Sequence, residues 1–374
     1  MSKQATQESN QAIQQLAEPP AQQTAKMPFG VEISRNLSGW LKSEGVTLAI
    51  STYQAGRVLF FGTKETTGEF SLFNRFYARA MGMHVASTDT IWLATLFQLW
   101  KLENVLKPTE RYQKDFERLY VPRVAYTTGD IDIHDIGTDN EGFPVFVSTA
   151  YSCLARPSTT RSFEPIWKPK FITKLAAEDR CHLNGMAMRD GRPAFVSAVA
   201  TTDCHNSWRE HRSEGGVLID VASHEIVCSG LSMPHSPRWH EGKLYVLNSG
   251  CGEFGTVDLA TGKFEKICFC AGYARGLAFT GDYAVIGLSN CRENRSFSGL
   301  ELDNALKNAK VSPRCGIIVV NLKTGDCVHH ATITGEIREL YDVGIIPNAR
   351  SGASIGFQNN EIKQLVTPGI MAKE

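Results

Sequence analysis

Residues 134–149 read HDIGTDNEGFPVFVST, which is a short apolar run opened by a polar residue, then a turn and a second strand. The same layout recurs in MGMHVASTDTIWLAT (81–95), NGMAMRDGRPAFVSA (184–198), HSPRWHEGKLYVLNS (235–249), RGLAFTGDYAVIGLS (275–289) and, in part, YDVGIIP (341–347). Successive copies start 53, 50, 51, 40 and 66 residues apart. Strand-rich repeats of about 40 to 50 residues are typical of a β-propeller. The sequence therefore predicts an all-β propeller.

The two ends of the chain are expected to complete one blade together. TLAIST (47–52), RVLFFGT (57–63) and FSLFNRFY (70–77) look like strands but have no opening strand of their own. The copy at 341–347 is an opening strand without a full set behind it. Pairing them closes the ring and leaves no open sheet edge there. The expected count is six blades, or seven if the 66-residue interval contains a further repeat.

One propeller domain is expected over residues 29–374. Residues 1–28 are rich in Gln, Ala and Ser and poor in large apolar groups, so we expect a disordered tail. A short helix is predicted at about 37–43. Two segments interrupt the strand pattern. The segment 291–315 contains a helical stretch and is expected to cover one face, and 151–171 either does the same or bridges two outer strands.

Charge and composition limit the partners of the protein. Lys plus Arg and Asp plus Glu both number 39, so no net charge attracts nucleic acid or an anionic membrane. The chain has no apolar run of about 18 residues and no secretory signal pattern. The ten scattered cysteines contain no Cys-x-x-Cys pair and are expected to be mostly buried and reduced. We expect a cytoplasmic protein without nucleic-acid or membrane partners, and the sequence leaves its oligomeric state open.

The first residue of each repeat is the position at which the repeats differ. These residues are Met81, His134, Asn184, His235, Arg275 and Tyr341. In a propeller the inner strands begin around the mouth of the central channel, so these side chains are expected to converge. His182 lies two residues before Asn184 and is predicted to point the same way. His84 lies three residues into its strand and is expected deeper in the channel, or in the ring if the register slips.

Histidines at this ring predict a metal site. His134, His182 and His235, with His84 as a fourth candidate, are the predicted ligands of a transition metal, Fe, Cu or Zn, because neutral imidazoles suit these ions. The alternative for each histidine is a hydrogen bond to the backbone of a neighbouring blade.

Three other ring residues are predicted to orient a substrate, namely Asn184, Arg275 and Tyr341. Arg275 is expected to clamp a carboxylate or phosphate through its planar guanidinium, or else to form an ion pair with Glu339 or Asp342. Tyr341 is expected either to donate a hydrogen bond to substrate or to pack as an aromatic side chain.

Acidic residues next to the histidines are candidates for orienting the imidazoles. The sequence GDIDIHD (129–135) places three carboxylates beside His134, and Asp179 precedes His182. The three are Asp130, Asp132 and Asp135. Capping of turns is the alternative role for each of them.

Several long motifs show a resemblance to a known family. The motifs are GDIDIHD (129–135), DRCHLNGMA (179–187), GGVLIDV (215–221), LSMPHSPRWH (231–240), ARGLAF (274–279) and FSGL (297–300). Over about residues 40–347 the chain resembles an uncharacterised bacterial family of propeller-like proteins. The resemblance implies the fold, an intracellular bacterial setting, and a site at the motif residues His134, His182, Asn184, His235 and Arg275. It implies a small residue where this chain has His84.

Two functions follow as expectations. The first is a metal-dependent enzyme at the channel mouth, acting on a small or peptidic substrate by oxidation or hydrolysis, since histidine-bound metals support both. The second is a non-catalytic propeller that binds an anionic small molecule or a partner peptide through Arg275.

Overall fold

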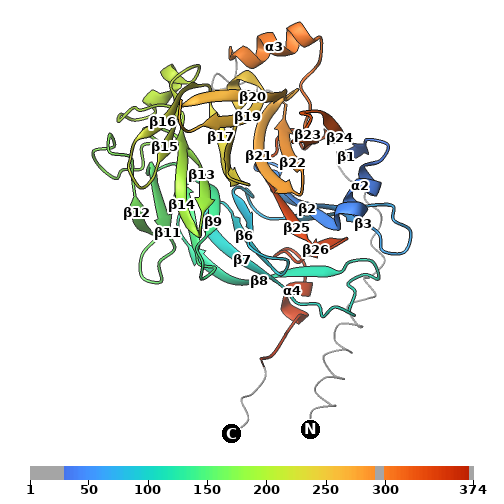
Figure 1. Cartoon of the computed structure of the whole chain (residues 1–374). Coiled ribbons are helices and arrows are strands. Elements are labelled where there is room, and N and C mark those ends of the chain that lie inside the picture. Colours follow the sequence, from blue (N-terminus) through green and yellow to red (C-terminus); the bar gives the residue numbers. More distant parts are fainter. Residues whose placement is uncertain (1–28, 291–298, 370–374) are drawn as a thin grey trace.

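The computed structural model describes residues 29–290 and 299–369, and in these residues six sheets surround one axis (Figure 1). The first three blades, from the inner strand outward, are β25 (Asp342–Pro347), β2 (Val46–Ser51), β3 (Arg57–Thr63) and β4 (Phe70–Phe76); β5 (Met83–Val85), β6 (Thr90–Ala94), β7 (Gln98–Asn104) and β8 (Arg118–Thr127); and β9 (Ile133–Thr138), β10 (Pro144–Ser148), β11 (Cys153–Arg156) and β12 (Glu164–Trp167).

The other three blades have the same order. They are β13 (Leu183–Arg189), β14 (Arg192–Ala198), β15 (Gly216–Asp220) and β16 (Ile226–Leu231); β17 (Pro234–His240), β18 (Lys243–Asn248), β19 (Glu253–Asp258) and β20 (Lys263–Phe269); and β21 (Tyr273–Thr280), β22 (Tyr283–Ser289), β23 (Gly316–Asn321) and β24 (Cys327–Gly335). The second strand of each blade is nearly all buried because both of its faces pack against neighbouring sheets.

Strands from both ends of the chain close the ring, and the prediction of six blades is confirmed. β25 pairs antiparallel with β2 from Val46 opposite Pro347 to Ser51 opposite Asp342. The ends also cover two outer edges, because β1 (Phe29–Ile33) pairs with β24 and β26 (Gly352–Ser354) pairs with β8. In the described part of the 66-residue interval the strands belong to the sixth blade, so a seventh blade is excluded there.

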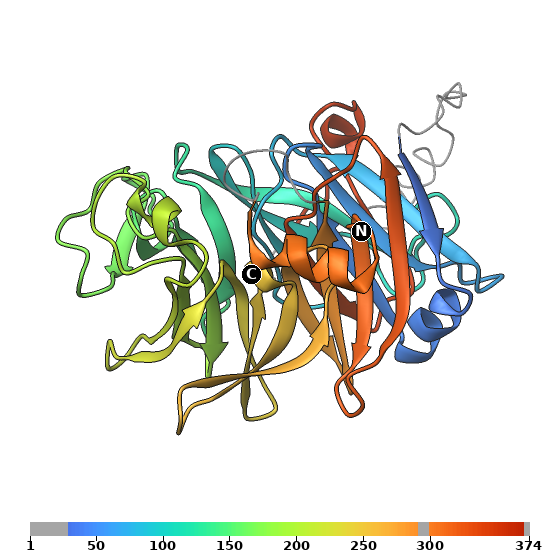
Figure 2. The same cartoon turned by 90° about the horizontal axis from the view of Figure 1, so that it is seen from above.

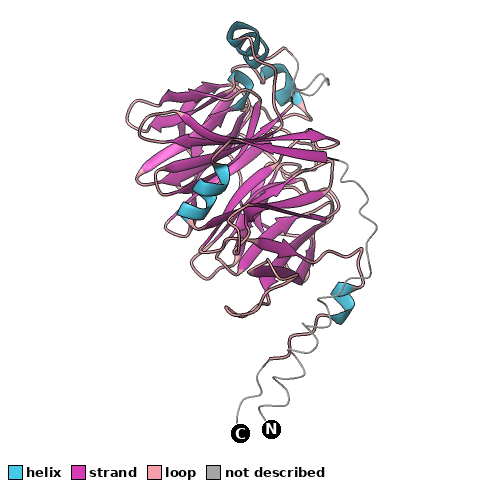
Figure 3. Ribbon diagram, turned by 90° about the vertical axis from the view of Figure 1, so that its right-hand side faces the viewer, coloured by secondary structure: helices cyan, strands magenta, loops and turns pink. Residues whose placement is uncertain are grey.

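Helices lie outside the sheets (Figures 2 and 3). α2 (Leu37–Glu44) is the predicted short helix and ends at Gly45, whose φ of 65° is left-handed. Short 3-10 turns, η1 (Ser207–His211) and η2 (Ser249–Cys251), and a last helix, α4 (Glu361–Gln364), complete the elements. No helix in the described ranges is long and apolar enough to cross a membrane.

The two predicted insertions differ in kind. The segment 151–171 contains β11 and β12, the outer strands of the third blade, so it is part of the propeller. The second, 291–315, contains α3 (Glu301–Ala309), as its sequence predicts. In the view of Figure 1, α3 lies outside the ring of inner strands, near β20. The tail predicted at 1–28 and the start of the second insertion, 291–298, fall outside the described residues.

The layer next to the channel mouth holds neighbouring blades together in an alternating pattern. Three blades carry a polar side chain that accepts a backbone N–H from the next blade: Asp135 from Met186 (2.9 Å), Ser236 from Gly276 (3.0 Å) and Asp342 from Met83 (3.0 Å). The other three carry Gly82, Gly185 and Gly276, where a Cβ would lie 3.0 Å or less from atoms of the following blade. This interlocking fixes the inner strands and therefore the side chains at their starts.

Candidate functional site

All six inner strands begin at one end of the channel, and the residue at each start is buried. None of the six predicted ring residues, Met81, His134, Asn184, His235, Arg275 and Tyr341, is more than 9% exposed. Each inner strand contacts the inner strands of both neighbouring blades, so these starts form a closed ring. We call this end the mouth.

Ring contacts join four predicted site residues into one group, the mouth cluster, consisting of His134, His182, Arg275 and Tyr341. The imidazoles of His134 and His182 have centroids 5.1 Å apart at an interplanar angle of 87°. The Tyr341 ring lies 5.4 Å from that of His134. The Arg275 guanidinium lies over the Tyr341 ring, with its Cζ 3.6 Å from the ring centroid, and forms a cation–π contact.

The other predicted mouth residues flank this cluster. The His235 ring packs edge-on against Tyr273 at 5.4 Å, and the Asn184 amide donates to the carbonyl of Pro234 at 2.9 Å. Two of the predicted metal ligands, His134 and His182, are in contact. Within residues 29–290 and 299–369, however, no three His, Cys, Asp or Glu side chains come together as a metal-binding group.

His84 lies away from the mouth. It is on β5, three residues beyond the ring position, and lines a cavity at the opposite end of the channel. Its Nε2 lies 3.2 Å from the Thr138 hydroxyl. Burial lowers the pKa of His84 to about 4. The sequence left its depth in the channel open, and the structure separates it from the other three histidines.

The three mouth histidines share one hydrogen-bonding feature. Nδ1 of His134 lies 3.2 Å from the Asp132 carbonyl, and Nδ1 of His235 lies 2.9 Å from the Met233 carbonyl. Nδ1 of His182 lies 2.9 and 3.0 Å from the Asp179 carboxylate oxygens. Because these oxygens only accept, each Nδ1 carries the hydrogen in this arrangement, and the lone pair of a neutral ring is on Nε2.

A repeated backbone turn produces this arrangement. In four consecutive blades the residue two places before the ring position has a left-handed φ: Arg79 (52°), Asp132 (54°), His182 (50°) and Met233 (47°). Non-glycine residues rarely adopt this conformation, which costs free energy and is concentrated at functional sites. In two blades the carbonyl of this residue contacts the ring histidine, Asp132 with His134 and Met233 with His235. In a third blade the residue in this conformation is His182.

Burial and charge keep the deepest imidazoles neutral. Burial, and then the positive charge of Arg275, hold the pKa values of His134 and His235 well below the usual range. Burial raises the pKa of Asp132 and raises that of the Tyr341 phenol well above its ordinary value, so the phenol stays protonated. At neutral pH Arg275 therefore places a fixed positive charge beside neutral His134 and His235.

Three ring residues, Arg275, Tyr341 and Asn184, have unused hydrogen-bonding capacity. Among the described residues, the Arg275 guanidinium has one ion-pair partner, Glu339 at 4.0 Å, and no hydrogen bond. Within the same residues the buried Tyr341 hydroxyl and the Asn184 amide oxygen have no hydrogen-bond partner. Buried polar atoms without partners cost free energy, so such a group indicates a site for water or ligand.

Of the three aspartates expected to orient the His134 imidazole, only one has its carboxylate near that ring. Asp132 stays close, with its carboxylate 3.6 Å from the imidazole Nδ1, whereas Asp130 pairs with Arg79. The Asp135 side chain turns to Arg238, at 2.6 Å, because alternation along β9 places it away from the mouth. Asp342 likewise lies 3.7 Å from Arg238 and does not pair with Arg275.

Two aromatic residues that the sequence did not single out support the mouth. Trp208, on η1, packs on His182 at 4.2 Å, and its Nε1 donates to Asp179 at 2.8 Å. Tyr53 stacks on Tyr341 at 5.2 Å. Neither lies at the start of an inner strand, so the repeat pattern gives no signal for them.

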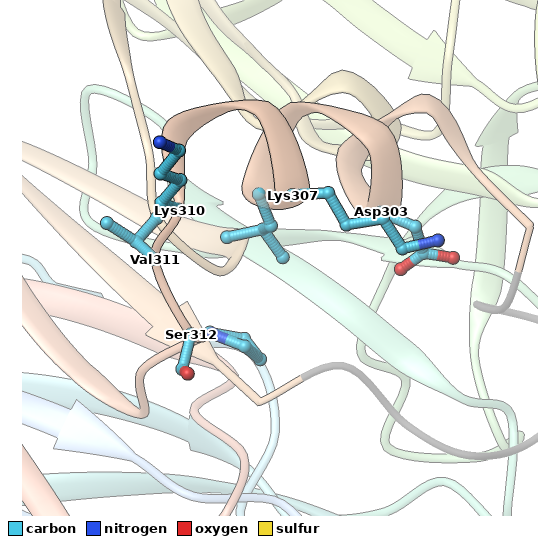
Figure 4. Close-up of a pocket in the computed structure, with 7 residues that line it drawn as sticks. Asp303, Lys307, Lys310, Val311 and Ser312 are labelled. Atoms are coloured by element: carbon cyan, nitrogen blue, oxygen red, sulfur yellow. The ribbon is translucent and has the colours of Figure 1, made fainter.

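A surface hollow beside α3 is distinct from the mouth. It has a volume of about 410 Å³ and is lined by Asp303, Leu306, Lys307, Lys310, Val311, Ser312 and Pro313 (Figure 4). None of the predicted site residues lines it.

Comparison with known proteins gives a family and a fold. A family model described as a domain of unknown function (DUF4915) matches residues 35–355. No curated protein matches the chain. Among solved structures, a chain of the nidogen/laminin complex matches with 10% identity and a TM-score of 0.50. The match covers 81% of the present chain and 99% of the chain in that complex. Virginiamycin B lyase from Staphylococcus aureus matches with 11% identity, a TM-score of 0.37, and coverage of 76% and 79%.

Proposed function

The chain belongs to the family described as a domain of unknown function (DUF4915), and from the geometry of the mouth we propose that it binds a small anionic molecule there. The buried Arg275 carries this proposal, because its guanidinium has no hydrogen bond from the described residues. A carboxylate or phosphate would fill the planar donor fork of the guanidinium.

Other polar groups at the mouth would hydrogen-bond to the same ligand. The Tyr341 hydroxyl donates to an anion, whereas the Asn184 amide oxygen and the Nε2 atoms of neutral His134 and His235 accept hydrogen bonds. This combination favours a ligand that carries hydroxyl groups next to its anionic group, such as a hydroxy acid or a sugar acid. The free thiols of the nine described cysteines support the cytoplasmic location proposed from the sequence.

Thermal unfolding with and without anions tests this function. Inorganic phosphate, succinate and gluconate serve as probes, and at least one is expected to raise the Tm, because a ligand that binds the native state stabilises it. Arg275→Met is expected to abolish the shift. Arg189→Ala is the matched control, since Arg189 also lies over aromatic rings, at 5.4 Å from Phe195 and 5.0 Å from Trp239, but at the end of β13, away from the mouth. Equal shifts in the wild type and Arg275→Met would contradict the proposal.

A second candidate is a metal-dependent enzyme, supported by the tautomers of the mouth histidines. Acceptors at Nδ1 orient metal-binding imidazoles in many proteins and leave Nε2 as the ligand atom. His134, His182 and His235 would be the ligands, with Fe, Cu or Zn as the metal. Bound iron or copper would supply oxidative chemistry and zinc hydrolytic chemistry, while Arg275, Tyr341 and Asn184 would orient a small or peptidic substrate.

Metal analysis separates the two candidates. Protein expressed with Fe, Cu and Zn present is expected to hold one metal ion per chain, and His134→Ala and His235→Ala are expected to lose it. His224→Ala is the control, since His224 stacks on Trp167 at 5.2 Å and is not a mouth residue. Wild-type protein without stoichiometric metal would eliminate this candidate and leave the anion site untouched.

A further inference from the structure

The end of the channel opposite the mouth contains a cavity of about 320 Å³. Inner strands of all six blades line it, each with at least one apolar or aromatic side chain: Val85, Ile136, Met188, Trp239, Phe279 and Ile345. Ligand pockets have volumes of about 300 to 1,000 Å³, so this cavity suits a molecule of about one ring.

The charged wall of this cavity is Arg238, most of whose hydrogen-bonding capacity is used. Nε donates to the Leu277 carbonyl (3.1 Å), and the two Nη atoms donate to the Asp135 carboxylate at 2.6 and 3.1 Å. Nη1 also donates to the carbonyls of Met186 and Pro237, each at 3.0 Å. Because guanidinium N–H bonds lie in the plane of the group, what remains for a ligand is its flat face.

This wall disfavours charged ligands. An anion finds no unused pair of donors on Arg238, and a cation entering the cavity meets a positive guanidinium. Asp135 pairs with that guanidinium, and burial raises the pKa of the nearby Asp342 carboxyl to about 7. At neutral pH the group as a whole therefore has little net charge, and neither aspartate lines the cavity. The cavity therefore favours a neutral molecule.

The same wall favours an aromatic ring. Guanidinium faces stack on aromatic rings, and methionine thioethers, here Met186 and Met188, make favourable contacts with ring edges. A stacked pair, His240 on Phe279 with centroids 4.3 Å apart at 3°, adds flat aromatic surface. Two imidazoles remain as polar groups: His84, which is neutral at physiological pH and contacts Thr138 through one nitrogen, and His240, whose Nε2 has no hydrogen-bond partner in the described residues.

We propose that this cavity binds a small neutral phenol, with its ring against the face of Arg238 and its hydroxyl hydrogen-bonded to His84. The site is separate from the mouth, because Arg238 and the residues that it bonds lie between the two ends of the channel. It does not depend on the anion-binding function proposed for Arg275.

Calorimetric titration with a set of probes tests the class of ligand. 4-Methylphenol is expected to bind roughly tenfold more tightly than 4-methylcyclohexanol, which has a similar shape but no π-system to stack on the guanidinium. 4-Methylbenzoate and 4-methylbenzylammonium are expected to bind more weakly than the phenol. Equal affinity for the phenol and the cyclohexanol, tighter binding of either ion, or no binding of the phenol would overturn the proposal.

Variants that fill the cavity test its location. Val85→Trp and, as a second substitution at a partly exposed wall position, Ile345→Trp are expected to abolish phenol binding, with folding checked by thermal unfolding. Arg275→Met, at the mouth, is the matched control and is expected to bind 4-methylphenol with wild-type affinity. Phenol binding that survives in a folded cavity-filled variant, or is lost with Arg275→Met, would place the ligand elsewhere.

Discussion

Arg238 and Arg275 lie in the same channel, one blade apart, and have opposite environments. Arg238 donates hydrogen bonds to a carboxylate and to three carbonyls, and two buried aspartates balance its charge. Arg275 is less exposed than Arg238 but, among the described residues, has only an aromatic ring beneath it and a carboxylate at 4.0 Å. A buried charge without hydrogen bonds is costly, so the hydrogen bonds of Arg238 show that its donors hold the fold together, and their absence marks Arg275 as a group whose donors bind a ligand.

The two arginines lie on opposite sides of a backbone bulge that both inner strands share. The β17–β18 register shifts between His235 and Arg238, where Ser236 has a left-handed φ of 48°. The β21–β22 register shifts between Ala274 and Leu277, where Gly276 has a φ of 82°. Arg238 therefore follows the bulge of its strand, whereas Arg275 precedes Gly276. Such a bulge changes the direction of the side chains that follow it. It allows His235 to lie at the mouth while Arg238 reaches Asp135 inside the channel.

Loss of the Asp135 carboxylate is expected to have the largest effect. Asp135→Ala leaves the Arg238 guanidinium buried without its main partner, which lowers the free energy of unfolding by about 3 to 5 kcal/mol. Urea denaturation measures this loss. Asp130→Ala is the control, because the Asp130–Arg79 pair is half exposed and is expected to contribute about 1 kcal/mol or less. Similar losses in both variants would mean that Arg238 is not held as described.

The pH dependence of stability is expected to show the neutral state of His134. Since its native pKa is lowered, the unfolded chain takes up a proton first as the pH falls below about 6.5, and stability is lost by up to about 1.4 kcal/mol per pH unit. His134→Gln removes this contribution, so its unfolding free energy is expected to fall less steeply than that of the wild type between pH 6.5 and pH 5. Urea denaturation at several pH values measures the two slopes. Parallel slopes would mean that His134 is protonated in the native state.

Removing the Arg275 guanidinium is expected to have little effect on stability without a ligand. Arg275→Met keeps an apolar side chain over Tyr341 and removes a charge that makes no hydrogen bond in the described residues, so the free energy of unfolding is expected to change by about 1 kcal/mol or less. Denaturation in anion-free buffer measures the change. A loss as large as that of Asp135→Ala would show that the two arginines are equivalent.

The smallest change is expected for the hydroxyl of Tyr341. Tyr341→Phe removes a buried hydroxyl that has no partner in the described residues, so stability is expected to stay within about 0.5 kcal/mol or to rise. Tyr77→Phe is the matched control, since the Tyr77 hydroxyl donates to the Ile355 carbonyl at 2.8 Å and its loss is expected to cost about 1 kcal/mol. Equal losses by thermal denaturation would mean that Tyr341 has a partner at the mouth.

Repeats and their spacing were sufficient to predict the fold. Apolar runs bounded by turns and repeated at a nearly constant interval predict strands, so the six opening strands and the pairing of the chain ends followed from the sequence alone. The helix before Gly45 followed from its local stop signal. Segment 151–171 shows where this failed, because its prolines and aromatics hide the two short strands β11 and β12.

The candidate site was predictable in its residues but not in its contacts. His134, Asn184, His235, Arg275 and Tyr341 were located by their shared position in the repeat. Whether each side chain would find a hydrogen-bond partner depended on left-handed turns and bulges. These features change the direction of a side chain without leaving a clear sequence pattern.

The sequence by itself therefore determined a propeller of six or seven blades, the closure of the ring by both chain ends and the positions that surround the mouth, because these depend on local strand patterns that repeat; the structure fixed the count at six. Only the tertiary structure decided that His84 lies at the far end of the channel, that Asp135 and Asp342 balance Arg238, and that Arg275 is left without a hydrogen bond in the described residues. These outcomes depend on contacts between blades, where the partner of each side chain is a residue about 50 or more positions away in the chain.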